Sequence, residues 1–71
     1  MIDKLSEATV LGRTIGPGTI LTISDEPGTF RFQSAYVTSA GRTVLNVIGG
    51  VAGHENWRSF YPERVESVGR G

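Results

Sequence analysis

Glycine is the residue that most limits what this chain can fold into. Ten glycines are scattered along the 71 residues, and each one weakens a helix because it loses more conformational freedom on folding than any other residue. Only residues 2–11 offer helical periodicity, with Ile2, Leu5 and Thr9 on one face. We therefore expect an all-β protein whose one helix, if it forms, is a short N-terminal one.

Runs of β-branched and aromatic residues between turn residues predict five to six short strands. The predicted strands lie within residues 10–15, 19–23, 30–38, 43–48, 57–61 and 65–68. In the turn at residues 26–29, Pro27 presets the first central position and Gly28 supplies the positive φ at the second. Turn signals at a spacing of roughly 8–12 residues are typical of a small barrel or sandwich.

A tight hairpin at Ala40-Gly41 pairs the two longest predicted strands. Alternation along residues 30–38 assigns one face to Phe30, Phe32, Ser34 and Tyr36, and the other to Arg31, Gln33, Ala35 and Val37. Folding at the hairpin sets Tyr36 opposite Leu45, on the side that also carries Phe32 and Val47. This side is apolar, so we expect it to face the core.

The composition excludes several kinds of site. The chain has no cysteine and one histidine, so no disulfide, metal site or cofactor is predicted. The N-terminus lacks the basic start and apolar run of a signal peptide, and no segment approaches the roughly 18 apolar residues of a membrane span. We expect one cytoplasmic domain over residues 1–71, with residues 1–8 and 69–71 flexible or peripheral.

The segment from Ser59 to Val68, SFYPERVESV, resembles the close of SH3-like barrels. In such barrels an aromatic strand meets a proline, makes one 3₁₀ turn and ends in a short strand around a valine. Pro62 starts a tight turn because its φ is fixed, and Val65 can return to the core. The resemblance implies a small SH3-like β-barrel of antiparallel strands. The acidic, tyrosine-rich motif that grips proline-rich peptides is absent, so peptide recognition of that kind is not implied.

The chain as a whole resembles small proteins of actinobacterial phages, of the mycobacteriophage type. Several of these end in a similar pattern of an aromatic residue followed by Pro-Glu-Arg-Val, which here is Tyr61 to Val65. This resemblance implies a phage accessory protein that acts in the host cytoplasm on a host or phage protein.

No set of residues predicts catalysis. His54 is the only histidine, and no serine lies on a Gly-x-Ser-x-Gly turn where a histidine could activate it. The close carboxylate pairs are Asp25-Glu26 and Glu63 with Glu66, and surface charge explains both because nothing indicates a buried site around them. We therefore expect a protein that is not an enzyme.

The aromatic cluster near the C-terminus is the leading candidate for a binding site. Trp57, Phe60 and Tyr61 lie with Arg58 and His54 in and beside one predicted strand. Tryptophan, tyrosine and arginine are enriched at the energetic centres of protein interfaces. Alternation places Phe60 on the face of Arg58, so we expect Phe60 to lie partly outward. These residues predict a module that binds another protein.

Two alternative functions stay open. Nucleic-acid binding would use a local patch of arginines, namely Arg31, Arg42, Arg58 and Arg64. The seven basic residues balance seven acidic ones, whereas non-specific nucleic-acid binders usually carry a basic excess. A structural subunit would instead bury the aromatic strand in a homo-oligomer. In the leading hypothesis, the glycine-rich residues 49–56 form a mobile loop that adjusts the approach of a partner.

Overall fold

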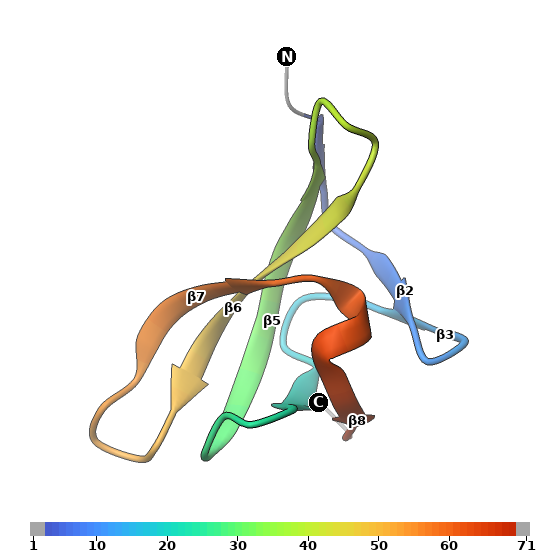
Figure 1. The fold of residues 1–71 in the computed structure, drawn as a ribbon. Helices are drawn as coiled ribbons and strands as arrows, with labels where there is room; N and C mark the ends of the chain where they lie inside the picture. Colours follow the sequence, from blue (N-terminus) through green and yellow to red (C-terminus); the bar gives the residue numbers. More distant parts are fainter. Residues whose placement is uncertain (1–2, 70–71) are drawn as a thin grey trace.

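The computed structural model describes residues 3–69 and shows a protein built from short antiparallel strands (Figure 1). The elements in chain order are β1 (Asp3–Leu5), β2 (Ala8–Val10), β3 (Arg13–Ile15), β4 (Ile20–Ile23), β5 (Thr29–Val37), β6 (Thr43–Gly50), β7 (Asn56–Phe60), the 3₁₀ turn η1 (Pro62–Arg64) and β8 (Val65–Val68). Within the described residues, η1 is the one helical segment. The all-β, barrel-like fold expected from the sequence is therefore confirmed.

One six-stranded sheet and one hairpin make up the fold. The sheet has the order β7-β6-β5-β4-β8, and β1 pairs with β5 beside β4. Along one edge, β5 pairs with β4 through its N-terminal half and with β1 through its C-terminal half. The hairpin of β2 and β3 forms a second sheet, which Figure 1 shows on the side away from β7.

Side chains from both sheets meet in one core. The buried set is Ala8, Val10, Ile15, Leu21, Ile23, Phe30, Phe32, Ala35, Leu45, Val47, Phe60 and Val65. Phe32 lies opposite Val47, and both are fully buried. The sequence predicted that both face the core, but not that they pair. The rings of Phe30 and Phe60 meet edge to face with their centroids 5.5 Å apart, a favourable aromatic geometry.

The short N-terminal helix that the sequence allowed does not form in residues 3–10, where the structure has β1 and β2 instead. Residues 4–7, predicted with the rest of 1–8 and with 69–71 to be flexible or peripheral, are exposed. β1 pairs with β5, with Leu5 opposite Ala35, and Ala8 reaches the core. The helical spacing was misleading because the burial that matters is the alternation of Ala8 and Val10 in β2. At the other end, the Gly69 N–H donates to the Ile20 carbonyl at 2.7 Å. Residues 1, 2, 70 and 71 of this prediction lie outside the described residues.

The segment 10–15, predicted as one strand, contains the turn of a hairpin. Leu11 and Gly12 have φ values of 49° and 74°, which separate β2 from β3. Two consecutive positive φ values are those of a type I′ turn, for which Asn-Gly is the usual sequence. The sequence hid the turn because leucine rarely adopts this conformation.

The predicted alternation holds for the first half of β5 and fails for the second. The pairing of β5 with β6 shifts by one residue between Phe32 and Ser34. The shift is a β-bulge at Gln33, and it turns Ala35 into the core instead of Ser34. An internal irregularity of this kind has no marker in the alternation pattern.

The hairpin between β5 and β6 is where the sequence predicted it, but its loop is one residue longer. The Gly41 N–H donates to the Thr38 carbonyl at 2.9 Å, and the Thr38 N–H donates to the Arg42 carbonyl at 2.7 Å. Gly41 has a φ of 83°, as three-residue hairpin loops require at that position. Tyr36 consequently lies opposite Val44, so its predicted pairing with Leu45 is wrong.

The last part of the chain follows the prediction closely. A 3₁₀ turn begins at Pro62, and β8 returns Val65 to the core.

Gly28 has the predicted positive φ, 83°. β6 extends through Gly50, so the predicted loop over residues 49–56 shortens to residues 51–55. Position 49 of this strand requires glycine, because a Cβ added there would overlap the Thr29 carbonyl oxygen of β5.

Candidate functional site

The structure divides the predicted aromatic cluster between the two faces of β7. Trp57 is 67% exposed and Tyr61, which follows the strand, is 41% exposed. Phe60 is 6% exposed and belongs to the core. The expectation that Phe60 lies partly outward is therefore wrong.

Phe60 is buried because two arginines cover its ring. The guanidinium carbons of Arg58 and Arg64 lie 5.0 and 5.3 Å from the ring centre. Arg58 donates two hydrogen bonds to Glu26, at 3.0 and 3.2 Å. Arg64 donates to the Ser24 carbonyl at 2.8 Å, and its Nη2 lies 3.8 Å from Glu26. These contacts close one end of the core with paired charges.

Trp57 ends a row of four side chains that crosses the outer face of the sheet. The row consists of Ile20 from β4, Arg31 from β5, Ile48 from β6 and Trp57 from β7, each opposite the next. Residues directly opposite in antiparallel strands place their side chains on the same face. We call these four residues the cross-strand row. Ile20 and Ile48 are half-buried, whereas Arg31 and Trp57 are exposed.

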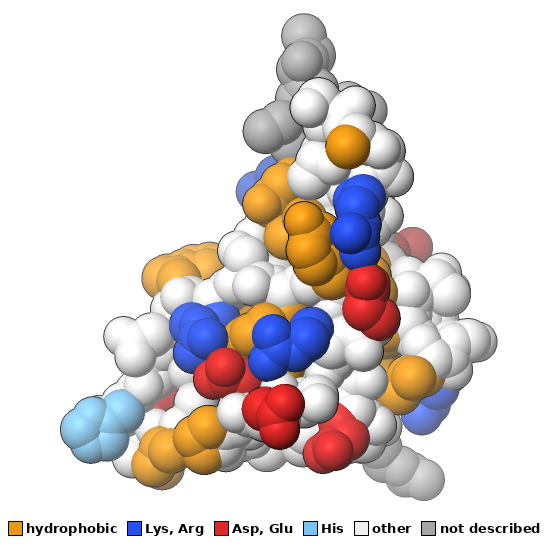
Figure 2. Space-filling view, viewed as in Figure 1, with side chains coloured by type: hydrophobic (Ala, Val, Ile, Leu, Met, Phe, Trp, Pro, Cys, Tyr) orange, Lys and Arg blue, Asp and Glu red, His pale blue; other side chains and the backbone are white. Residues whose placement is uncertain are grey.

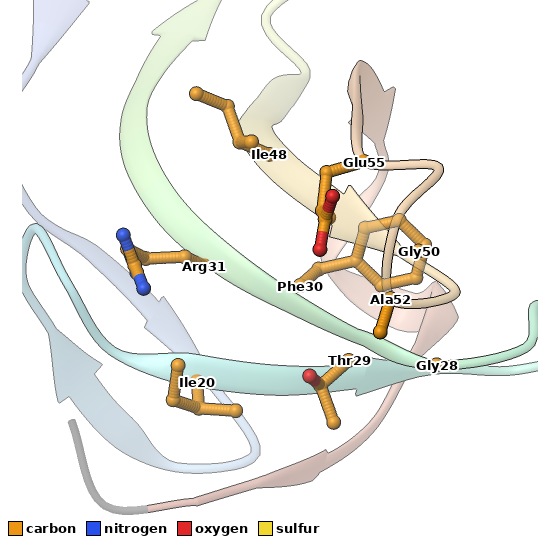
Figure 3. Close-up of a pocket in the computed structure, with 10 residues that line it drawn as sticks. Ile20, Gly28, Thr29, Phe30, Arg31, Ile48, Gly50, Ala52 and Glu55 are labelled. Carbon is orange, nitrogen blue, oxygen red and sulfur yellow. The ribbon is translucent and has the colours of Figure 1, made fainter.

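Three members of the cross-strand row, Ile20, Arg31 and Ile48, line a hollow of about 550 Å³ (Figure 3). The side chains of Ala52 and Glu55, from the loop after β6, also line it. The surface is concave beside Ile48 because the next outward position of β6 is Gly50, which has no side chain. Figure 3 shows Arg31 and Glu55 on either side of the β5 ribbon.

The outer face continues from Trp57 toward Tyr61. Ser59 Oγ lies 3.0 Å from Asn46 Oδ1 and donates to it, and Asn46 Nδ2 donates to Ser34 Oγ at 3.3 Å. Beyond this polar strip, Tyr61 helps to line a second hollow of about 420 Å³. The remaining lining residues are Tyr36, Thr38, Val44, Ser59, Phe60 and Arg64. One sheet face therefore joins the two exposed aromatic residues of the predicted site.

Ion pairs engage most of the predicted arginine patch. Arg42 Nη2 lies 2.7 Å from Glu63 Oε2, and the Arg42 guanidinium lies 4.0 Å from the centre of the Tyr61 ring. Arg58 and Arg64 share Glu26, as described above. Figure 2 shows basic and acidic side chains next to one another on the face it views. Of the four predicted arginines, Arg31 alone has no ion pair with any residue from 4 to 69.

His54 lies in the exposed loop between β6 and β7. Its backbone N–H donates to the Val51 carbonyl at 2.8 Å, and its carbonyl accepts from Asn56 Nδ2 at 2.9 Å. The backbone of His54 thus shapes the loop, while its side chain is exposed. Among the side chains of residues 4–69, no group of three or more acidic or histidine residues is arranged to hold a metal ion.

The sequence interpretation missed Ile20, Ile48 and Asn46 as members of the candidate surface. Alternation contained a signal for them. In the segments 19–23 and 43–48, Ile20 and Ile48 alternate with the core residues Leu21 and Val47. Their neighbours across the sheet could not be assigned because the register depends on the bulge and on the hairpin loop.

The fold and this surface define a small all-β, barrel-like protein with an exposed aromatic residue on one sheet face. The whole chain, residues 1–71, matches the model of a family described as a domain of unknown function (DUF7246), and the chain belongs to that family. No curated protein and no solved structure gives a significant match. In the part of the chain that the structure describes, no helix has the length and apolarity needed to cross a membrane.

Proposed function

We propose that this protein is a non-enzymatic interaction module that binds another protein through the outer face of its sheet, with Trp57 as the anchor. The observation that carries this proposal is the position of Trp57, which is 67% exposed on a regular strand. An exposed tryptophan leaves a large apolar area in water that a partner can cover. Buried tryptophans at the centre of interfaces often dominate the binding energy.

The surroundings of Trp57 favour binding by a preorganised surface. β7 pairs with β6 from Asn56 to Phe60, and Trp57 lies opposite Ile48. The backbone that carries the indole ring is therefore held by a sheet. Little conformational entropy is lost when such a side chain is covered, so more of the apolar contact energy becomes affinity. The half-buried Ile48 adds apolar area beside it.

The structure changes the roles of the other predicted residues. Tyr61 lies on the surface at the far end of the same face, with the Arg42 guanidinium over its ring. Phe60 supports the surface from the core. Arg58 lies on the core-side face of β7, where it binds Glu26. We therefore assign partner binding to Trp57 with support from Tyr61.

The competing functions have weaker support. Nucleic-acid binding needs several uncompensated cations, but Arg42, Arg58 and Arg64 each have a carboxylate partner. One observation favours self-assembly: β7 is an edge strand of its sheet, and it carries Trp57. A second copy of the chain could cover that edge, and this would make the molecular mass depend on concentration.

The test is a quantitative affinity capture with three baits: the wild-type chain, Trp57→Ala and Leu11→Ala. The resemblance to phage proteins directs this search to the lysate of an actinobacterial host. Leu11 is a matched control because it is an exposed apolar residue, 59% accessible, in the turn between β2 and β3, away from the proposed binding face. We expect one discrete protein to be captured by the wild type and by Leu11→Ala, and to be lost with Trp57→Ala.

Each competing function gives a different result in the same experiment. Capture that disappears after nuclease treatment, or that falls steeply with salt, would assign the surface to nucleic acid. A wild-type dimer in light scattering that becomes monomeric with Trp57→Ala would assign it to self-assembly. Equal capture by all three baits would contradict the proposal. Circular dichroism and a thermal melt serve as the control that Trp57→Ala is folded.

A further inference from the structure

Arg31 occupies an unusual position on the proposed binding face. The strand register places it between Ile20 and Ile48, so aliphatic side chains flank the stem of an exposed arginine. Its guanidinium has no ion pair and donates no hydrogen bond to any side chain or carbonyl among residues 4–69, unlike those of Arg42, Arg58 and Arg64. A guanidinium presents a planar fork that matches a carboxylate in two parallel hydrogen bonds.

The charge on the other side of the hollow narrows the choice of ligand. Glu55 lines the hollow together with Arg31, and its Oε2 accepts from the Gly53 N–H at 3.3 Å. A nucleic-acid strand carries a negative charge at every nucleotide, so it would bring phosphates close to Glu55 as well as to Arg31. A peptide with a single carboxylate can pair with Arg31 and keep its other groups neutral.

We infer that the partner presents an acidic peptide segment, in which one Asp or Glu binds Arg31 and one large apolar side chain packs on Ile48 and Trp57. This inference rests on the proposed function and adds the chemistry of the partner. The positive charge of Arg31 and the adjacent apolar side chains of Ile48 and Trp57 both support it.

The row also sets the spacing of the two recognised side chains. Arg31 and Trp57 lie on strands separated by one strand, β6, so they are roughly 10 Å apart across the sheet. An extended peptide advances about 3.3 Å per residue. The acidic and apolar residues of the partner are therefore separated by two or three positions along its chain.

The test is the selection of random twelve-residue peptides, displayed as a library, on the immobilised full-length chain. On the wild type we expect enrichment of Asp or Glu two or three positions from an aromatic or large aliphatic residue. Arg31→Gln should remove the acidic preference, and Arg31→Glu should reverse it to Lys or Arg. Arg13→Glu is the matched control: Arg13 is an exposed arginine of the β2–β3 hairpin, and the change in net charge is identical.

The affinity of an enriched peptide is then measured on each variant. Loss of a charge-assisted pair should weaken binding by roughly tenfold to hundredfold in Arg31→Gln. Arg31→Lys keeps the charge without the fork, so it should retain the acidic preference with lower affinity. A thermal melt of each variant confirms that it is folded.

The outcomes separate this inference from the proposed function. An acidic preference that persists in Arg31→Gln would overturn the inference, whereas loss of all enrichment in Trp57→Ala would still support the proposed function. A fluorescent single-stranded oligonucleotide that binds through Arg31, with steep salt dependence, would overturn the inference in favour of nucleic acid. A library in which the wild type enriches no peptide would overturn the inference alone, because the proposed function is decided separately by the capture with Trp57→Ala.

Discussion

The guanidinium carbon of Arg58 lies 5.0 Å from the centre of the Phe60 ring. The two residues alternate onto the same face of β7, yet Arg58 is exposed and Phe60 is 6% exposed. Both facts hold together because the long arginine side chain folds over the ring while its charged end binds Glu26. An exposed arginine is therefore part of the cover of a buried phenylalanine.

This arrangement predicts stability losses of very different size for two aromatic residues of one strand. Phe60→Ala should lower the free energy of unfolding by about 3–5 kcal/mol, because it leaves a cavity in the core. Trp57→Ala should lower it by less than about 1 kcal/mol, because the indole ring is mostly in water. Urea denaturation measures both, and Phe60→Leu serves as a milder variant if Phe60→Ala does not fold. Equal losses at the two positions would contradict the assigned burial.

Two of the three ion pairs among residues 4–69, Arg58–Glu26 and Arg42–Glu63, should differ in strength. The side chains of Arg58 and Glu26 are 42% and 22% exposed, whereas those of Arg42 and Glu63 are 50% and 66% exposed. Arg58 also binds Glu26 through two hydrogen bonds. We expect a coupling energy of about 1 kcal/mol for the first pair and less than about 0.5 kcal/mol for the second. Double-mutant cycles with Arg58→Met, Glu26→Gln, Arg42→Met and Glu63→Gln measure the two values. A larger coupling for the exposed pair would refute this ranking.

Gly49 should tolerate no side chain, for a steric reason alone. Its φ is not positive, but an added Cβ would overlap the Thr29 carbonyl oxygen in the neighbouring strand. Gly49→Ala should therefore lower the free energy of unfolding by about 3 kcal/mol or more, since backbone must move to make room. Gly16 is the matched control, because nothing lies within 4 Å of its added Cβ and its φ is not positive. Gly16→Ala should leave the free energy of unfolding unchanged or raise it slightly. Thermal melts of the two variants beside the wild type measure both effects.

The turn between β2 and β3 contains a residue that the turn itself does not favour. Leu11 has a φ of 49° in a type I′ turn, where asparagine is preferred because its short polar side chain tolerates this conformation. Leu11→Asn should raise the free energy of unfolding by about 0.5–1 kcal/mol. Leu11→Val should lower it, because β-branched side chains are the least compatible with positive φ. Urea denaturation measures both values. Equal free energies of unfolding for the two variants would show that the backbone at residue 11 is not under this constraint.

The elements that could be predicted are those specified by neighbouring residues. Thr19–Ile23 contains β4, and Pro62 begins the 3₁₀ turn that leads into β8. Gly28 adopts the positive φ that its place after Pro27 predicts. These features follow from local preferences for backbone angles, and such preferences can be predicted from a few consecutive residues.

The candidate surface was predicted in part. Trp57 and Tyr61, named from the sequence as binding residues, are exposed, although the alternation argument had turned the opposite face of the strand, that of Arg58 and Phe60, toward water. The exposure of Phe60 was predicted wrongly. Arg58 was taken as a sign that its face is open to water, while its actual neighbours, Glu26 and Arg64, come from other parts of the chain.

The sequence by itself determined that the chain is all-β, where most of its strands lie, and how its last strand closes the fold. Only the tertiary structure decided the bulge at Gln33, the strand in residues 3–5 and the pairing of three arginines with Glu26 and Glu63. It also brought Ile20, Arg31, Ile48 and Trp57 into one row. The physical reason is that side-chain alternation is local, whereas strand register is a property of two distant segments. A shift of one residue moves every side chain beyond it to the other face.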